Sequence, residues 1–462
     1  MSTAAAVEDL CTRARAAQAG LASLSLRERA VFVRSLRKGM LARAEELIAT
    51  IIEESGKVRA EVIGLEMVPS ALALTYAAKV GPHALAEESV PSFLPLPRRA
   101  TRRFRPRGVV GLITPFNYTL AIPMGTIAFA LAAGDAVVWK PAESGVRAAR
   151  LFAAIVDEAS ERAGLAPGLV MVFSGGADAG RALLDGPIDH LTFVGSTAAG
   201  RAVAARCGER LLPCILELGG SAPAIVLDDA DLERAARAIV FGGLANAGQS
   251  CIGVERVFAL PRVFDALIDK TARLAESVRP GVDVSALQPS QRVRLNDLLD
   301  DARRAGARFL NPFVIDATGT SARIIDEEIF GPAIPFVKVQ HVDEAIARAN
   351  AHPQQLCAYV FGGDKGAREV ARRLLAPHVV TGDVMISYAM MELPFGGARA
   401  GGLGRVHGVE GLRALSEEQI FVEGHLPLQQ EPWWLPYQSR GADLLLKALG
   451  PALALLDKRP HR

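Results

Sequence analysis

Residues 108–140, GVVGLITPFNYTLAIPMGTIAFALAAGDAVVWK, alternate between strand-like and helix-like composition. The runs VVGLIT and AVVWK are short, apolar and rich in β-branched residues, as in buried strands. Between them, PMGTIAFALAAG is rich in alanine and has the length of a helix. A strand, a helix and a strand in this order indicate a parallel β-α-β unit.

The same alternation continues on the C-terminal side. LVMVF, HLTFVG and CILELGG are further strand-like runs, and RAARLFAAIVDEASERAG and AGRALLDG are helix-like. A second α/β run starts at APAIVLDD and extends to about residue 410. The segment 279–326 within it is polar and irregular, and no strand is assigned there. The pattern predicts doubly wound parallel sheets.

The N-terminal 90 residues have helical periodicity. RRATRRFR, within 98–105, alternates like an exposed strand. Such a basic, edge-like strand needs cover from another subunit or domain.

Overall composition excludes several classes of protein. With 52 Lys and Arg against 50 Asp and Glu, and 6% aromatics, the chain offers neither the charge nor the stacking surface for nucleic acid. The five cysteines show no metal or redox spacing, so we expect reduced thiols, no metal site and a cytoplasmic location. We expect no secretory signal and no integral membrane segment, because Asp443, Lys447 and Pro451 interrupt the longest C-terminal apolar run.

Two residues stand out as candidates for chemistry. Cys251, in NAGQSC, is flanked by small residues, and a loop-to-helix junction there would favour its thiolate. A lone cysteine is more often a buried apolar residue. Glu217, in LELGG, is a carboxylate inside a strand, so it would titrate as a general base or form a structural ion pair. Gly219 and Gly220 would let another backbone or a ligand approach closely.

Four further residues lie at or just after the ends of predicted strands, where ligands bind in doubly wound sheets. Asn117 could donate a hydrogen bond to an oxyanion, or it could simply form a turn. Lys140 and Glu143 could bind ribose hydroxyls or form an exposed ion pair. Ser196 precedes a helix start that would suit a pyrophosphate.

Seven motifs occur in order between residues 114 and 397: TPFN, KPAE, FVGS, LELGG, GQSC, EEIFGP and PFGG. Together they closely resemble the aldehyde dehydrogenase superfamily. The resemblance implies an α/β fold with a variant Rossmann NAD(P)-binding domain, a catalytic α/β domain and a bridging oligomerisation arm. The expected boundaries are 1–218 for the cofactor domain, with the arm at about 95–107 inserted, and 219–409 for the catalytic domain. The arm would resume at 410–430, before an amphipathic tail at 431–462.

The resemblance also implies roles for individual residues. Cys251 matches the nucleophile that forms a thiohemiacetal and then a thioester, and Glu217 matches the base that activates water. The amide of Asn117 and the backbone N–H of Cys251 would hold the oxyanion. The expected cofactor contacts are Thr114, Phe116, Lys140, Glu143, Gly195, Ser196, Leu218, Glu328 and Phe330. These roles imply a hydrolytic enzyme that oxidises an aldehyde with NAD, with NADP as the alternative cofactor, and assembles as a homodimer or homotetramer.

The substrate is less sharply indicated. Arg399 and Arg405 could bind the carboxylate of a semialdehyde, whereas Tyr388, Met390 and Met391 would suit an apolar or aromatic aldehyde. Asp135 stands where the family usually carries Asn. The segment 279–326 looks shorter than in the family, which concerns the substrate entrance.

Three alternatives stay open. A CoA-acylating relative would transfer the thioester to a thiol, but such relatives commonly lack a glutamate at position 217. An idle scaffold of the same fold would not need Cys251, Glu217 and Asn117 together. A thiol esterase activity would be a side reaction of the same cysteine.

Overall fold

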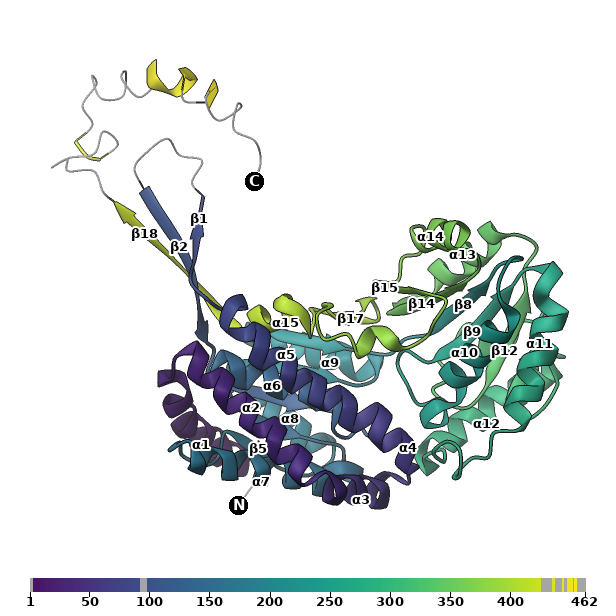
Figure 1. Cartoon of the computed structure of the whole chain (residues 1–462), viewed down its shortest axis with the longest axis horizontal. Coiled ribbons are helices and arrows are strands. Elements are labelled where there is room, and N and C mark those ends of the chain that lie inside the picture. Colours follow the sequence, from purple (N-terminus) through teal and green to yellow (C-terminus); the bar gives the residue numbers. More distant parts are fainter. Residues whose placement is uncertain are drawn as a thin grey trace.

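The computed structural model describes residues 3–91 and 98–424, together with the short pieces 434–436, 443, 447–451 and 453–454. Residues 95–97 of the predicted arm and most of the predicted tail, 431–462, lie outside the described residues. The chain forms two α/β units side by side, and a narrow three-stranded arm projects from the N-terminal unit (Figure 1). The fold is therefore α/β, as expected.

The N-terminal unit contains a sheet of order β17-β7-β6-β3-β4-β5. All neighbouring strands run parallel except β17, which is antiparallel to β7. The predicted strands appear where their apolar runs occur. They are β3 (Val109–Ile113), β4 (Ala136–Lys140), β5 (Val170–Val172), β6 (His190–Val194) and β7 (Cys214–Glu217), joined by β17 (Gly402–Leu403).

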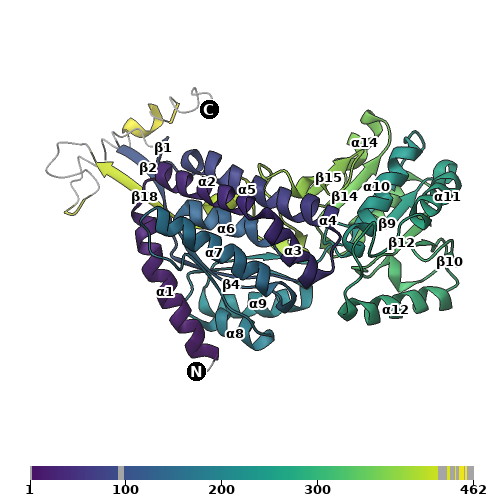
Figure 2. The ribbon, with the colours of Figure 1, turned by 60° about the horizontal axis from the view of Figure 1, so that its bottom comes forward.

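Helices cover both faces of this sheet. Figure 2 shows α6 and α7 on one side of β4 and α8 and α9 on the other, while α2 and α5 pack outside α6. The helical elements are α1 (Thr3–Ser23), α2 (Leu26–Ala42), α3 (Ala44–Ser55), α4 (Arg59–Glu61), η1 (Val62–Met67), α5 (Val68–Ala84), α6 (Ala121–Ala133), η2 (Glu143–Gly145), α7 (Val146–Arg162), α8 (Ala177–Asp185) and α9 (Thr197–Arg210). The N-terminal 90 residues are thus mostly helical, as their periodicity predicts.

The second unit contains a sheet of order β10-β11-β12-β9-β8-β14-β15. Its strands are β8 (Ala222–Val226), β9 (Val254–Ala259), β10 (Arg308–Phe309), β11 (Val314–Asp316), β12 (Ile334–Lys338), β14 (Cys357–Phe361) and β15 (His378–Thr381). The helical elements that follow or flank them are α10 (Leu232–Leu244), η3 (Ala245–Gly248), α11 (Pro261–Glu276), α12 (Pro289–Arg304), η4 (Arg323–Ile325), α13 (Val342–Ala351), α14 (Asp364–Ala371) and η5 (Ile386–Tyr388). Helix α15 (Gly408–Ala414) returns to the N-terminal unit, where it packs against α5 and α6. A short pair, β13 (Gln354–Gln355) and β16 (Ala398–Arg399), lies beside the sheet.

The segment 279–326 is more regular than its composition indicates. It forms α12 and the strands β10 and β11. These strands are only two and three residues long, and β11 joins the sheet by pairing with β12. Strands this short carry no readable periodicity, so the sequence does not reveal them.

The arm is formed by β1 (Glu88–Val90), β2 (Arg98–Pro106) and β18 (Ser416–Gly424). The predicted basic strand is β2, and it lies between β1 and β18 within one chain. Strand β18 exposes Ile420, Phe421 and Val422, each more than half accessible. Because β18 is an outer strand of the arm (Figure 1), these apolar side chains lie exposed at an unpaired sheet edge.

Residues 59–84 form the one described helical stretch that is long and apolar enough to cross a bilayer. Half of the most apolar part of this stretch is buried inside the protein, where α5 packs against α2 and α6. This is the pattern of a core helix, so its length is weak support for a membrane span.

Asp135 is a buried acid at the start of β4, where the resembled family usually has Asn. Its Oδ1 accepts the N–H of Gly108, and its Oδ2 has no partner. Burial raises the pKa of Asp135 to about 8, although Arg107 and Arg29 oppose the shift. A carboxyl whose folded-state pKa lies above its unfolded value lowers stability progressively between the two values. The loss therefore develops from about pH 4 to about pH 8.

Asp135→Asn should therefore stabilise the protein by roughly 1 to 4 kcal/mol at pH 8, and by less at pH 5. Urea unfolding at the two pH values measures this difference. Asp178→Asn, at an exposed position on α8, is the control and should change little at either pH. An equal gain for Asp135→Asn at both pH values would contradict the titration of this carboxyl.

Candidate active site

Cys251 lies in the turn between η3 and β9. The expectation of a helix start after this residue is wrong, because Ile252 and Gly253 lead directly into strand β9. Burial raises the pKa of the Cys251 thiol well above its usual range, and Cys357, Glu217 and Glu328 add to the shift. This environment favours the neutral thiol over the thiolate.

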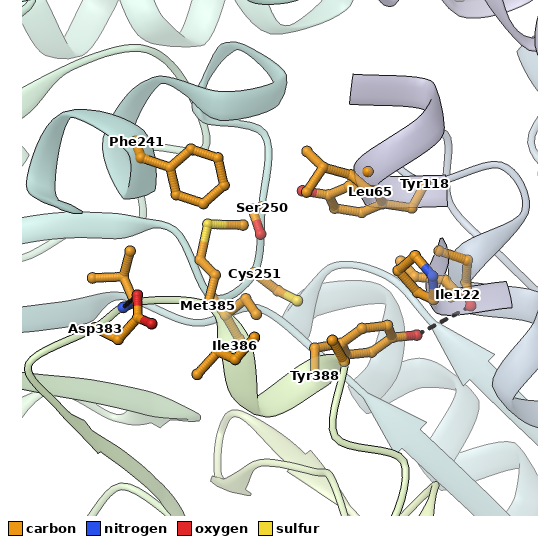
Figure 3. A pocket seen from close by; sticks show the side chains of 16 residues that line it. Leu65, Tyr118, Ile122, Phe241, Ser250, Cys251, Asp383, Met385, Ile386 and Tyr388 are labelled. Carbon is orange, nitrogen blue, oxygen red and sulfur yellow. Dashed lines mark hydrogen bonds between the residues drawn. The ribbon is translucent and has the colours of Figure 1, made fainter. Parts of the chain in front are cut away.

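Two cavities meet at Cys251. The first has a volume of about 250 Å³ and reaches the cysteine from one side. Figure 3 shows the Cys251 sulfur pointing into this cavity, with Leu65 and Tyr118 on one side and Tyr388 on the other. Its lining is almost entirely apolar and comprises Gly64, Leu65, Pro69, Tyr118, Ala121, Ile122, Phe241, Ser250, Cys251, Ile252, Asp383, Val384, Met385, Ile386, Tyr388 and Ala389.

The second cavity, of about 160 Å³, approaches Cys251 from the N-terminal unit. Six of the nine expected cofactor residues line it: Phe116, Gly195, Ser196, Leu218, Glu328 and Phe330. The structure thus brings these six predicted residues together at one cavity, although they belong to two different α/β units. Cys251 thus lies in the lining of both a small apolar cavity and a more polar one, so two different molecules could lie on either side of this residue.

Asn117 belongs to the loop between β3 and α6 and is buried. Its Nδ2 donates to the carbonyl of Gln249, at 3.1 Å. An amide nitrogen carries two N–H groups, so the second N–H stays available to an oxyanion near Cys251. The same loop also lines the second cavity through Pro115 and Phe116.

Glu217 ends strand β7, and both of its carboxylate oxygens are buried without a hydrogen-bond partner. Burial raises the pKa of Glu217 well above its usual range, and the nearby Arg405 partly opposes the shift. A buried, unpaired carboxyl of this kind can take up a proton near neutral pH. The reading of Glu217 as a residue of a structural ion pair finds no support among the described contacts.

The two glycines after Glu217 lie against the site. A Cβ on Gly220 would stand 2.2 Å from the carbonyl oxygen of Cys251, and one on Gly219 would stand 2.3 Å from Glu328. The close approach predicted for LELGG therefore involves the backbone of the loop that carries Cys251. Glu328 itself accepts hydrogen bonds from the Gly220 N–H at 3.3 Å and from Gln354 Nε2 at 2.9 Å.

Ser196, and the expected cofactor residues that do not line this cavity, lie near the carboxyl ends of strands in the first sheet. Ser196 is the N-cap of α9, and its hydroxyl accepts the N–H of Ala199. Lys140 ends β4 and is half-buried. Desolvation lowers its pKa, and the adjacent Glu143 opposes this shift. Thr114 has a different contact, since its hydroxyl accepts the indole N–H of Trp139 at 2.8 Å. That bond ties the ends of β3 and β4 together.

Several residues at the site are not evident in the sequence. Gln291 and Arg294 of α12 line the second cavity, and Arg294 also donates to the carbonyl of Glu328. Glu255, in β9, is buried and accepts the backbone N–H groups of Ile329 and Phe330. A charged residue within the buried strand VERVFA is a signal that could have identified Glu255.

The residues suggested for substrate binding need correction. Tyr388 lines the apolar cavity, but Met390 and Met391 do not, and Met385 takes that place. Arg405 lies beside Glu217 and donates to the carbonyls of Gly397 and Gly404, away from the apolar lining. Arg399 is exposed on β16 and donates to the carbonyl of Asn350. The turns of the PFGGARAGGLGR segment direct both guanidinium groups away from the cavity.

Comparison with known proteins agrees with this arrangement. The model of the aldehyde dehydrogenase family matches residues 1–421. The chain is 31% identical over 430 residues to a probable coniferyl aldehyde dehydrogenase of Pseudomonas aeruginosa, covering 89% of each chain. It is 32% identical over 486 residues to a putative succinate-semialdehyde dehydrogenase [NADP(+)] of Mycolicibacterium smegmatis, covering all of this chain and 92% of the relative.

Solved structures are equally similar. A Mycobacterium tuberculosis aldehyde dehydrogenase, solved in complex with NAD+, superimposes with a TM-score of 0.84 at 28% identity, covering 93% of this chain and 92% of that one. The match extends over both α/β units. The chain therefore belongs to the aldehyde dehydrogenase family of oxidoreductases.

Proposed function

We propose that this enzyme oxidises an aldehyde to the carboxylic acid through a thiohemiacetal and a thioester on Cys251. The observation that carries the proposal is the junction of an apolar cavity with a second, more polar cavity at the Cys251 sulfur. A nucleophile placed there contacts an aldehyde on one side and a redox cofactor on the other. Splitting the oxidation into attack, hydride loss and hydrolysis requires one nucleophile, one oxyanion site and one base.

The cofactor of the proposal is NAD, with NADP possible. The second cavity fits it, because the N-terminus of α9 offers backbone N–H groups to phosphate and Arg294 adds a positive charge. Glu143, near the expected adenosine ribose, would repel a 2′-phosphate and favours NAD. When bound, the cofactor supplies the acceptor for the hydride that leaves the thiohemiacetal.

The protein's own groups carry the remaining steps. After the thiol proton passes to water, the Cys251 thiolate attacks the aldehyde carbon. The second N–H of Asn117 Nδ2, with the backbone N–H of Cys251, holds the resulting oxyanion, and the thiolate leaves again when the thioester is hydrolysed. After hydride loss, Glu217 removes a proton from water, which attacks the thioester carbonyl. The raised pKa of Glu217 matches this basic role.

We infer that the substrate is an apolar or aromatic aldehyde. Among the residues that line the first cavity there is no Lys or Arg, and the only carboxylate is Asp383. Asp383 lies across the cavity from Tyr118, near Phe241 and Met385 (Figure 3). A substrate carboxylate in this cavity would lack a cationic partner and would be repelled by Asp383, so desolvation would weaken its binding.

A panel of aldehydes, assayed by NADH or NADPH formation without CoA, tests this function. We expect kcat/KM for an aromatic aldehyde such as coniferyl aldehyde to exceed that for succinic semialdehyde by about 10²-fold or more. Asp383→Asn should reduce this preference, because it should raise kcat/KM for succinic semialdehyde and leave kcat/KM for the aromatic aldehyde unchanged. A preference for the semialdehyde would contradict the substrate class, and no turnover with any aldehyde would contradict the reaction.

We also propose that the enzyme forms a homo-oligomer and is cytoplasmic. The apolar outer edge of β18 supports a homodimer or homotetramer in which a second copy covers the arm. The expected domain limits also remain proposals, although β17 pairs with β7 and so brings residues 402–403 back to the first sheet. A cytoplasmic enzyme agrees with its five free cysteines.

A further inference from the structure

A π-helical turn lies next to the active site, between α4 and α5. It spans Val62–Met67 (η1), and the N–H of Val68 donates to the carbonyl of Ile63, the i→i+5 bond of a π-helix. On a regular α-helix, residues five apart point about 140° away from each other. In a π turn they lie about one turn apart and share a face. The turn thereby places Glu61 and Glu66 on one side of the helix.

Glu61 holds the loop that carries the nucleophile. One carboxylate oxygen accepts the backbone N–H of Asn246 at 2.7 Å, and the other accepts the N–H and the hydroxyl of Ser285. Asn246 and Ala247 both have left-handed backbone conformations, with φ of 53° and 55°. Such conformations are costly for residues other than glycine, so this turn needs fixed contacts.

Glu66 holds the loop that carries the oxyanion amide. Its two oxygens accept the N–H groups of Thr119, Leu120 and Ala121, at 2.8 to 2.9 Å, where α6 begins. Its charge is paired with Lys57, whose ammonium also lies 4.5 Å from the centre of the Tyr118 ring. Both Glu66 and Lys57 are buried, which makes the contact rigid and specific.

The two loops also bond to each other. Asn246 Nδ2 donates to the carbonyl of Asn117 at 2.8 Å and to that of Gln249 at 3.1 Å, and Asn117 Nδ2 donates to the same Gln249 carbonyl. Because the loops belong to different α/β units, the helix that bears both carboxylates spans the junction between the units. Glu61 thus holds the loop of Cys251, and Glu66 holds the loop of Asn117.

We propose that Glu61 and Glu66 are positioning residues: through the π turn, they set the placement of Asn117 Nδ2 relative to the Cys251 sulfur. This inference rests on the proposed function, in which these two groups act on one aldehyde. Neither carboxylate contacts the first or the second cavity. Displacement of a catalytic group by about 1 Å can reduce the rate about 10²-fold, so loss of either anchor would act mainly on the chemical step.

A double-mutant cycle on the full-length enzyme tests the role of Glu66. The measured quantity is the rate of the single-turnover NADH burst, with KM for the aldehyde and Kd for NAD alongside. We expect Glu66→Gln to slow the burst at least about 10-fold in the wild type but less than about threefold in Asn117→Ala, with KM and Kd within about threefold. An equal loss in both backgrounds would show a merely structural role and would overturn the proposal for Glu66.

Glu66→Gln leaves the buried Lys57 without its charged partner, which destabilises the fold. The paired change Lys57→Met with Glu66→Gln removes both charges and keeps the experiment decisive. Thermal unfolding identifies folded variants. Glu45→Gln is the matched control, since Glu45 is an exposed glutamate on α3 whose side chain pairs with Arg59 of α4.

Glu61→Gln has a separate signature. Loosening the turn at Asn246 should expose the partly buried Cys251 thiol further, so iodoacetamide should alkylate Cys251 faster while the burst becomes at least about 10-fold slower. An unchanged burst and unchanged alkylation would overturn the role of Glu61. A wild-type enzyme without a burst that depends on Cys251 would instead overturn the proposed function itself, and the positioning roles with it.

Discussion

Cys251→Ala should lower aldehyde oxidation by at least about 10⁴-fold while leaving NAD affinity within about twofold. The substitution removes the sulfur that attacks the aldehyde, and the remaining groups cannot form the thioester. Cofactor affinity should persist because most of the second cavity is lined by residues other than Cys251, from the β3–α6 loop, the β6–α9 turn, the segment after β7, α12 and the loop before β12. Steady-state NADH formation measures the first effect, and calorimetric titration with NAD measures the second.

Cys214→Ala is the matched control for this variant. Cys214 is also a partly exposed free thiol, but it begins β7 at the end of the strand opposite to Glu217. We expect its activity to stay within about twofold of the wild type. Dehydrogenase activity that survives in Cys251→Ala would contradict the assignment of the nucleophile, and activity lost in both variants would indicate a general effect of removing thiols.

Glu217→Gln should separate the two halves of the reaction. Attack and hydride transfer do not require the base that activates water, so a burst of NADH should persist within about threefold of the wild-type rate. The steady-state rate should fall about 10²- to 10⁴-fold, because the thioester then waits for uncatalysed hydrolysis. Rapid mixing followed by NADH absorbance resolves both phases.

The pH dependence provides a second measurement on the same variant. A base acts only when ionised, and burial raises the pKa of Glu217. The wild-type steady-state rate should therefore rise with pH through that pKa, and the rise should be absent in Glu217→Gln. Equal losses of burst and steady-state rate would place Glu217 in an earlier step. Restoration of turnover in the variant by added CoA alone would favour thioester transfer to a thiol.

Most strands were predictable because their information is local. VVGLIT and AVVWK in the first unit carry enough apolar, β-branched residues to identify buried strands, and the structure contains them at the expected positions. The seven ordered motifs likewise identify the family without any coordinates. By contrast, β10 and β11 depend on pairing with distant residues and leave no local pattern.

Within the site, the sequence identified the candidate residues but not the directions in which their side chains point. The sequence alone named Cys251, Glu217 and Asn117, because their motifs are contiguous. It could not reveal that Arg405 faces Glu217 while Met385 faces the apolar cavity, since side-chain direction depends on turns and on packing between units.

The loops that carry Asn117 and Cys251 show the division most clearly. The motifs TPFN and GQSC identify the candidate catalytic residues from the sequence. The carboxylates that hold these loops, however, come from a helix 50 or more residues earlier in the chain. Short-range periodicity and motif order specify which elements form and which family they belong to. The cavity chemistry and the anchoring network arise only when α4, η1 and the two α/β units pack together, because buried polar groups acquire partners that no local pattern encodes.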